Sequence, residues 1–356
     1  NINPPWLLLS MIAALPLALP AATASACTTF AMGAGESLLV GKSYDWDIGH
    51  GLVLVNKRGV KKQALVLAPK VTPARWTSRY GSLTFNQYGR ELPNGGINEA
   101  GLVVEIMWLS GTRHGVLGPE RPTVNELQWI QYQLDLSATI TEAVAAARAL
   151  QVARVYADVH YLACDKQGAC ATFEYIKGEL VVHAGKKLPA RALTNSTYAA
   201  SSTALKSYKG FGGKQAIPRG GGSLARFVRA ASLARAGGKE PTVASAFKIL
   251  KSVQQGAYTK WQIVYESAQG KVHFKMPGRQ IRSIKLKDLD FGCKAPVRVM
   301  DLSGSILTGG EGLTPYKRAH NLKLIQLSVA KLPLKLPQIL LQQFAAYPEL
   351  STSCVK

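Results

Sequence analysis

The sequence predicts one α+β domain of stacked layers behind a short N-terminal leader. Segments that favour strands and segments that favour helices come in groups: strands, two helices, strands, two helices and strands again. No Pro/Ser-rich linker and no internal repeat divides them. The 356 residues, 47% hydrophobic and 18% charged, are enough to bury a full core without metals or a dense set of disulfides.

Residues 1–26 have the pattern of a signal peptide. An apolar run over residues 6–19 is followed by small residues that end in an A-x-A cleavage site at Ala26. The run is too short and too interrupted by proline for a good membrane span. The chain does not open with Met and has no basic residue before the run, so we expect an incomplete N-terminus. We predict a periplasmic or secreted protein whose single domain is residues 27–356 and whose first mature residue is Cys27.

Strands open the domain and two helices follow. Thr123 and Glu126 predict a capping box for the first helix, and Thr139 or Thr141 caps a second helix over Glu142–Leu150. β-Branched and aromatic runs between Gly-rich turns predict strands at Thr28–Met32, Ser37–Tyr44, Gly51–Val55, Ser82–Tyr88 and Leu102–Trp108.

The second half of the domain has the same alternation. A Gly/Lys-rich loop over Lys206–Gly222 precedes helices at Leu224–Ala236 and Val243–Gln254. Strands return over Lys260–Lys275, and a last helix near Pro337–Ala346 closes the chain. Before the loop, strands are predicted at Val155–Cys164, Ala171–Ile176 and Glu179–His183.

The chain has five cysteines, and an exported protein can hold cysteine pairs as disulfides. Cys164 and Cys170 flank a polar turn between two strand-like runs, which favours a bridge across a hairpin. Cys293 and Cys354 would then tie the C-terminal tail to the body. Both pairings are hypotheses, and together they leave Cys27 unpaired.

The net charge of +22 belongs entirely to residues 27–356, because the leader has no charged residue. Such a surplus favours anionic partners, including the surface of the cell envelope. The basic residues are spread along the chain without a dense block, an arginine-rich helix or zinc-type spacing, so we expect no nucleic-acid partner. No metal-ligand spacing appears, and we expect no cofactor.

A cysteine at the start of a chain has its own base. The α-amine has an unperturbed pKa of roughly 8, and the thiolate is the reactive form of cysteine, so nucleophile and base come from one residue. The six histidines are scattered and suggest no Cys/His pair. Two other interpretations of Cys27 stay open: a lipoprotein cysteine, although Ala24 stands where a lipobox favours Leu, or an ordinary residue beside a cleavage site.

Five short motifs follow one another in order: CTTF at 27–30, GKSYDW at 41–46, GINEAGL at 96–102, LTNS at 193–196 and ARFVR at 225–229. Together they resemble the ordered motifs of the choloylglycine hydrolase family, which contains bile salt hydrolases and penicillin V acylases. The resemblance implies a four-layer αββα sandwich of the N-terminal-nucleophile hydrolases, a small-molecule N-acyl amide substrate and often a homotetramer.

The same resemblance assigns roles around the nucleophile. Asp45 would hold the α-amine by a charge-assisted hydrogen bond, and Asn98 and Asn195 would donate to the oxyanion. Arg226 would favour the thiolate. Lys42 stands where many members have Arg; it keeps the point charge but loses the planar fork. Structural alternatives stay open, with Asp45 or the asparagines in turns and Arg226 exposed on a helix.

The predicted reaction is hydrolysis of an N-acyl amide of the penicillin V or conjugated bile salt type, through a thioester on Cys27. N-Acyl homoserine lactones are an alternative substrate for the same mechanism. From another class of protein, the alternative is a non-catalytic, basic, lipid-anchored envelope protein. Aromatic residues that would line an acyl pocket, or else pack in the core, are Tyr44, Trp46, Tyr88, Trp108, Trp129 and Tyr132.

Overall fold

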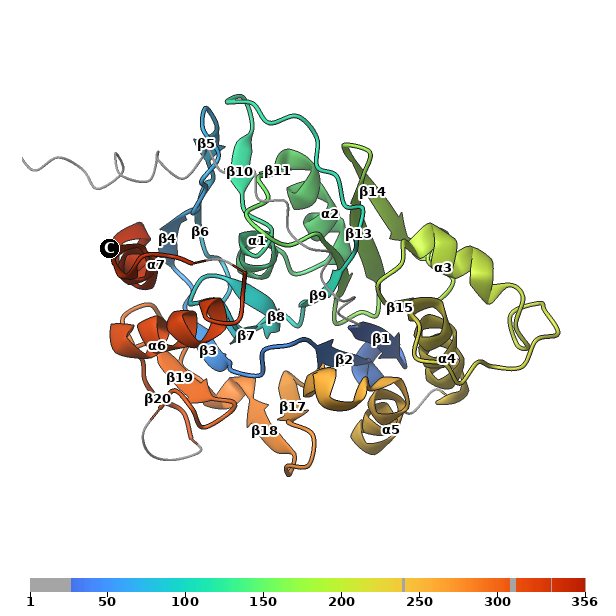
Figure 1. Ribbon diagram of the computed structural model, residues 1–356. Helices are drawn as coiled ribbons and strands as arrows, with labels where there is room; N and C mark the ends of the chain where they lie inside the picture. Colours follow the sequence, from blue (N-terminus) through green and yellow to red (C-terminus); the bar gives the residue numbers. More distant parts are fainter. Residues whose placement is uncertain (1–26, 239–240, 308–311, 334, 356) are drawn as a thin grey trace, which may run out of the picture.

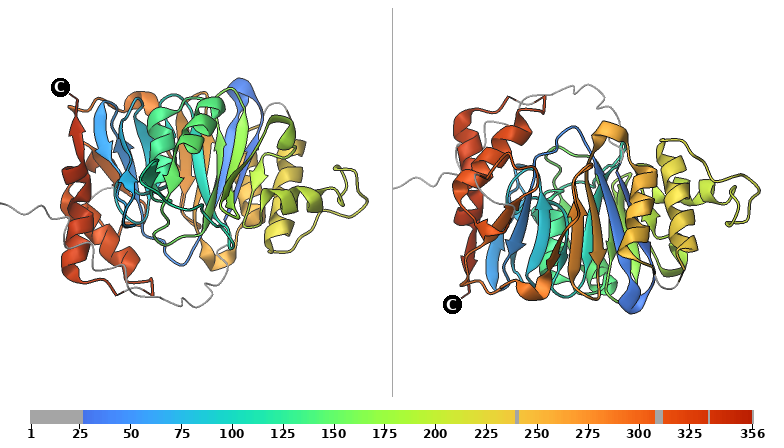
Figure 2. Two further views of the ribbon diagram at one scale, coloured as in Figure 1. Left: turned by 90° about the horizontal axis from the view of Figure 1, so that it is seen from above. Right: turned by 90° about the horizontal axis from the view of Figure 1, so that it is seen from below.

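The computed structural model describes residues 27–238, 241–307, 312–333 and 335–355. The predicted signal peptide, residues 1–26, lies outside the described residues. Two large antiparallel sheets lie face to face, and helices cover their outer faces (Figures 1 and 2). The predicted α+β class is confirmed, and the layers are those of an αββα sandwich.

The first large sheet places the start of the domain in its interior. Its order is β15 (Ala192–Leu193), β1 (Thr28–Met32), β2 (Leu39–Asp45), β16 (Thr259–Glu266), β17 (Lys271–Lys275) and β18 (Arg282–Lys285). Helices α4 (Ser223–Ala236) and α5 (Val243–Val253) pack against β1 and β2, and α3 (Tyr198–Leu205) packs against α4.

The second large sheet forms the other inner layer. Its order is β14 (Glu179–Ala184), β13 (Cys170–Ile176), β12 (Val159–Cys164), β9 (Val103–Trp108), β8 (Pro93–Asn98), β7 (Ser82–Asn86), β3 (Leu52–Asn56), β19 (Arg298–Asp301) and β20 (Thr314–Pro315). Helix α1 (Gln128–Leu136) packs on β8 and β9, and α2 (Ile140–Ala149) packs on α1.

Two small sheets and a helix pair complete the described part of the chain. Helices α6 (Arg318–Val329) and α7 (Gln338–Ser351) pack on each other, on the side of the molecule away from α4 and α5 (Figure 1). The small sheets have the orders β11 (Gln151–Val152), β10 (Pro122–Val124), β5 (Thr72–Pro73) and β21 (Thr352–Cys354), β4 (Val60–Gln63), β6 (Arg75–Thr77).

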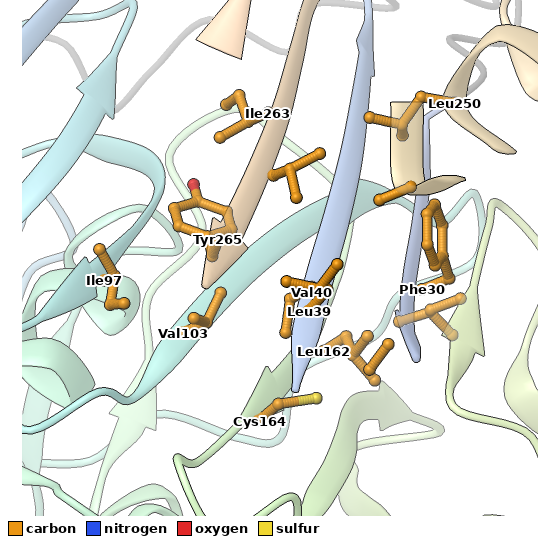
Figure 3. Close-up of a cluster of buried hydrophobic side chains, with 14 of the residues drawn as sticks. Phe30, Leu39, Val40, Ile97, Val103, Leu162, Cys164, Leu250, Ile263 and Tyr265 are labelled. Carbon is orange, nitrogen blue, oxygen red and sulfur yellow. The ribbon is translucent and has the colours of Figure 1, made fainter. Parts of the chain in front are cut away.

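The main core lies between the two large sheets. Leu39, Val40 and Tyr265 come from the first sheet, and Val103 and Leu162 come from the second (Figure 3). All five are at most 3% exposed. Burying a large apolar side chain of this kind stabilises the fold by roughly 1.5–3 kcal/mol, so this layer holds the two sheets, and the residues at their ends, in register.

The two helices after β10 differ in how well the sequence predicts their starts. Thr139 caps α2 in a capping box with Glu142, one of the two caps predicted. The capping box predicted at Thr123 is wrong, because Thr123 lies in β10 and α1 begins at Gln128. The Glu126 carboxylate instead accepts hydrogen bonds from the backbone N–H groups of residues 155–157. These residues lie outside β12, which begins at Val159 and not at Val155 as predicted.

Both predicted disulfides are confirmed. Cys164–Cys170 closes the β12–β13 hairpin, and Cys293–Cys354 ties β21 to the segment after β18. Cys27 is the free cysteine, and it is buried. Two disulfides thus account for four of the five cysteines, and the free thiol of Cys27 directly precedes β1.

A buried ion network joins β4 to α1. The Lys62 ammonium lies 2.8 Å from Glu91 and 2.9 Å from Asp135, and all three side chains are at most 4% exposed. The Trp76 indole and the Gln131 amide donate to the Asp135 carboxylate as well. Because each charge has partners, the network is compatible with burial, but removal of any member would leave a charge uncompensated.

Candidate functional site

An apolar cavity of about 180 Å³ opens at the start of β1. One water needs only about 10–15 Å³, so the cavity is large enough for an organic group. Cys27 is one of its lining residues, and most of the others are aliphatic or aromatic. The polar side chains at the Cys27 end decide what chemistry the cavity supports.

Cys27 is 4% exposed and lies next to the end of β2. Its sulfur is 3.7 Å from the main-chain oxygen of Asp45. Burial raises the pKa of the Cys27 thiol, while the charges of Lys42 and Arg226 lower it and that of Asp45 raises it. The two cations therefore oppose the effect of burial and favour the thiolate.

Asp45 ends β2 beside the start of β1. The strand register pairs Thr28 with Ser43, so Asp45 lies beside the backbone on the N-terminal side of β1. Its Oδ1 accepts hydrogen bonds from Ser43, at 2.9 Å, and from the Thr259 hydroxyl. Burial raises the pKa of this carboxyl, and the two hydroxyls lower it. The carboxylate is thus held where it can orient a group at the start of the chain.

Lys42 is a fully buried cation in the middle of β2. Its ammonium donates to the main-chain oxygen of Ile106 and lies 3.8 Å from Glu105 Oε2. The Tyr265 hydroxyl donates to the same carboxyl at 2.5 Å. Burial raises the pKa of Glu105 to about 7, against the effect of Lys42. A single carboxyl and a carbonyl therefore orient the lysine that replaces the expected arginine.

Gly95 on β8 leaves the space that Glu105 occupies. A Cβ at this glycine would collide with the Glu105 carboxyl group. The two residues are opposite one another in the β8–β9 pairing. The sequence contains no signal that links these positions, so Glu105 was not predicted as part of the site.

Arg226 joins three segments that are far apart in the sequence. It lies near the start of α4 and is 1% exposed, so the alternative of an exposed helix arginine is wrong. Its guanidinium donates to the main-chain oxygen of Cys27 at 2.7 Å, to the Thr28 hydroxyl at 2.6 Å and to Asn195 Oδ1 at 2.8 Å. Cys27 and Asn195 are thereby fixed to one rigid, forked cation.

Asn195 follows β15 and presents its amide to the site. Because Arg226 takes the side-chain oxygen, the NH₂ group faces the other way, where it donates to the main-chain oxygen of Trp108 at 2.9 Å. The Asn195 backbone N–H donates to the Ser223 hydroxyl at 3.0 Å. The hydrogen bond to Trp108 uses one of the two amide hydrogens, so the group has a second hydrogen to offer a substrate oxygen.

A buried histidine supports this segment from behind. His160 lies 2.7 Å from the main-chain oxygen of Thr194 through Nε2 and 2.9 Å from Glu174 through Nδ1. Glu174 Oε1 also accepts the backbone N–H of Tyr198 at the start of α3. The pair holds the residue next to Asn195, and nothing in the sequence marked either member.

Asn98 lies elsewhere, and this corrects the expectation that it donates to an oxyanion. Its NH₂ group donates to the main-chain oxygens of Leu134 and Ser137, at 2.8 and 2.7 Å. Its oxygen accepts the backbone N–H groups of Ala100 and Leu102. Asn98 ends β8 and lies beside the first residues of β9. Trp108, which Asn195 contacts, is the last residue of β9. At the usual rise per residue, Asn98 therefore lies roughly 20 Å along the strand from Trp108. Asn98 joins a turn to the end of α1.

The aromatic candidates divide between cavity and core. Trp46 stacks on Trp108 with 5.6 Å between ring centroids and donates to the Tyr88 hydroxyl at 2.8 Å. The residues that line the cavity, as predicted, are Tyr44, Trp46, Tyr88 and Trp108. Trp129 instead stacks on Tyr161 in the core, and Tyr132 packs on Trp76. Trp129 and Tyr132 are therefore packing residues.

The residues that the structure describes show neither a metal cluster nor a membrane-spanning helix. They contain no group of three or more His, Cys, Asp or Glu residues that would hold a metal ion. In the same part of the chain, no helix has the length and hydropathy needed to cross a bilayer.

The chain is similar to several known proteins. The model of the family described as linear amide C-N hydrolases, choloylglycine hydrolase family, matches residues 27–299. A penicillin V acylase from Pectobacterium atrosepticum is 30% identical over 171 residues, which are 44% of this chain and 45% of that protein. The chain thus spans less than half the length of this curated relative.

Two solved structures have the same architecture. The penicillin V acylase from Agrobacterium tumefaciens superposes with a TM-score of 0.72 at 26% identity, over 82% of this chain and 98% of that one. A conjugated bile acid hydrolase from Clostridium perfringens superposes with a TM-score of 0.63 at 17% identity, over 82% of this chain and 97% of that one. The second likeness concerns the fold alone.

Proposed function

Because the chain belongs to the choloylglycine hydrolase family of linear amide C-N hydrolases, we propose that it cleaves N-acyl amides with Cys27 as its nucleophile. The substrates proposed are of the penicillin V or conjugated bile salt type. One observation carries the proposal: a free thiol lines an apolar cavity and lies beside two buried cations, Lys42 and Arg226, and an oriented amide, Asn195.

The first step forms a thioester. The α-amine of Cys27 takes the thiol proton, and the thiolate attacks the substrate carbonyl. The NH₂ group of Asn195 donates to the oxygen as it becomes negative, a contribution of about 3 kcal/mol for one such donor. The α-amine, oriented by Asp45, then gives its proton to the nitrogen that leaves. The C–N bond breaks and the acyl group stays on sulfur.

The second step restores the enzyme. The neutral α-amine takes a proton from water, and the resulting hydroxide attacks the thioester carbonyl. The carbon–sulfur bond breaks, the acid leaves, and the proton returns to Cys27. The charges of Lys42 and Arg226 lower the pKa of the Cys27 thiol, so they stabilise the thiolate that leaves in this step.

The mechanism needs a free α-amine, so we also propose that residues 1–26 are removed and that the enzyme is periplasmic or secreted. The burial of Cys27 supports this proposal over a lipid anchor. A diacylglyceryl group on this sulfur would have to fill the cavity that the substrate needs.

The test is a hydrolysis panel on the purified mature protein together with its intact mass. The panel contains penicillin V, glycocholate, taurocholate and acyl homoserine lactones, and Cys27→Ser is the matched variant. We expect an unmodified Cys27 terminus, turnover of at least one substrate and a loss of about 1,000-fold or more in Cys27→Ser. Wild-type turnover in Cys27→Ser, or a lipid-modified terminus on the active protein, would contradict the proposal.

A further inference from the structure

One wall of the cavity comes from the C-terminal helices α6 and α7 and the segment between them. None of its residues lies in the range 27–299 that the family model matches. In all three views, α6 and α7 lie apart from β1 (Figures 1 and 2). Cys27, which directly precedes β1, and residues of the C-terminal segment nevertheless line the same cavity. The wall, called here the C-terminal wall, consists of Ile325, Val329, Leu332, Leu336 and Phe344.

The C-terminal wall is fastened to the sandwich and to itself. Asn321 on α6 donates to the main-chain oxygen of Ala345 on α7 at 3.0 Å and accepts the backbone N–H of Arg90 at 2.8 Å. The Ser328 hydroxyl donates to the main-chain oxygen of Gln87 at 2.6 Å. At its other end, α7 runs into β21, which pairs with β4. The wall therefore has a set position, and its side chains limit the depth of the cavity.

The cavity offers no partner to a charged acyl group. Among the described residues that line it there is no Lys, Arg or His. Glu126 is the one carboxylate among them, and it accepts hydrogen bonds from the backbone N–H groups of Val155, Tyr156 and Ala157. A substrate carboxylate or sulfonate would lose its water there without gaining a cationic partner. The cavity thus fits the uncharged acyl side of an N-acyl amide.

We propose that the C-terminal wall sets the length of the acyl group this enzyme accepts, and that the preferred acyl group is uncharged. The inference rests on the proposed function, because it assumes that the acyl carbonyl lies at Cys27. The far end of the acyl group then contacts Val329 and Phe344, both half-buried side chains whose size sets the depth of the cavity.

The experiment measures kcat/KM for N-acyl 4-nitroanilides from butanoyl to dodecanoyl. In the wild type, kcat/KM should rise by about fourfold per added methylene until the chain reaches the wall. Val329→Trp should lower the dodecanoyl value about tenfold or more and leave butanoyl within about twofold. Phe344→Ala should move the optimum to longer chains. Ile339→Ala, on the exposed face of α7, is the matched control and should keep the wild-type profile.

The outcomes separate the two proposals. A wild-type chain-length profile in both Val329→Trp and Phe344→Ala, or an equal loss at every length, would overturn the role of the wall. If no chain length is cleaved, and no substrate of the hydrolysis panel above is cleaved either, the proposed function fails. In either case, binding of the free fatty acids to Cys27→Ala by calorimetry then decides the inference. The inference is supported if affinity rises with chain length in Cys27→Ala and if Val329→Trp, added to this variant, lowers the affinity for long chains. Affinity that does not depend on chain length overturns it.

Discussion

Asn98 and Asn195 are both part of motifs that resemble the family's active site, but the structure gives them different roles. We expect Asn195→Ala to impair catalysis and Asn98→Ala to impair stability. Asn98 is fully buried and takes part in four hydrogen bonds to main-chain groups. At about 1 kcal/mol each, their loss lowers the free energy of unfolding by about 4 kcal/mol.

The size of each effect follows from the structure. A domain of this length has an unfolding entropy of about 0.7 kcal/mol/K, so 4 kcal/mol corresponds to a fall of about 6 °C in Tm. Asn195→Ala removes two side-chain hydrogen bonds and lowers Tm by about half as much. It also removes the donor that we propose for the oxyanion, and a loss of about 3 kcal/mol corresponds to a fall of roughly 150-fold in kcat.

The assay combines thermal unfolding with kcat at 25 °C, where both variants remain folded. Asn98→Ala should keep kcat within about threefold of the wild type. The reasoning is refuted if Asn98→Ala melts with the wild type and loses kcat about 100-fold, since that result would return this residue to the active site.

Three further outcomes concern stability. Lys62→Ala should lower the free energy of unfolding by about 3–5 kcal/mol, because two buried carboxylates lose their cation. Arg58→Ala, the control, breaks an exposed ion pair and should lower it by less than about 1 kcal/mol. Equal losses for the two variants in urea unfolding would contradict this prediction. The Glu105 carboxyl has a pKa of about 7 in the folded protein against 4.5 as its ordinary value, so it retains a proton that the unfolded chain releases, and stability should fall by about 3 kcal/mol as pH rises from 4.5 to 7. Glu105→Gln should lose this slope, and an unchanged slope would show that another group titrates. Cys354→Ser opens a disulfide with a sequence separation of 61 from Cys293 and should cost about 4 kcal/mol, which a wild-type melting curve would exclude.

The parts of the fold that sequence patterns predict well are local. The Cys164–Cys170 bridge crosses a turn of few residues, and the Thr139 cap depends on a side chain three positions away. The capping box predicted at Thr123 has the right residue types but loses to β10, because strand pairing with distant segments competes with local capping. Helix α6 was not predicted, since its apolar residues do not form one clear stripe.

For the site, the residue types were predictable and their partners were not. Cys27, Asp45 and Arg226 come together as the motifs implied. That Glu105 accompanies Lys42 depends on the β8–β9 register and on the space left by a glycine, and neither can be read from one sequence. A resemblance between motifs predicts which residue types are present, whereas the distance of a residue from Cys27 depends on which end of a strand it occupies.

The place of the C-terminal wall in the sequence has a consequence for how such an enzyme can change. The polar side chains around the thiol all come from residues 27–259, and the wall begins at Ile325. Substitutions from Ile325 onward therefore change the lining of the cavity and leave the polar and charged residues around Cys27 unchanged. Natural selection, or a mutant library confined to the last two helices, can therefore change which acyl group the enzyme accepts. The residues around Cys27 stay the same.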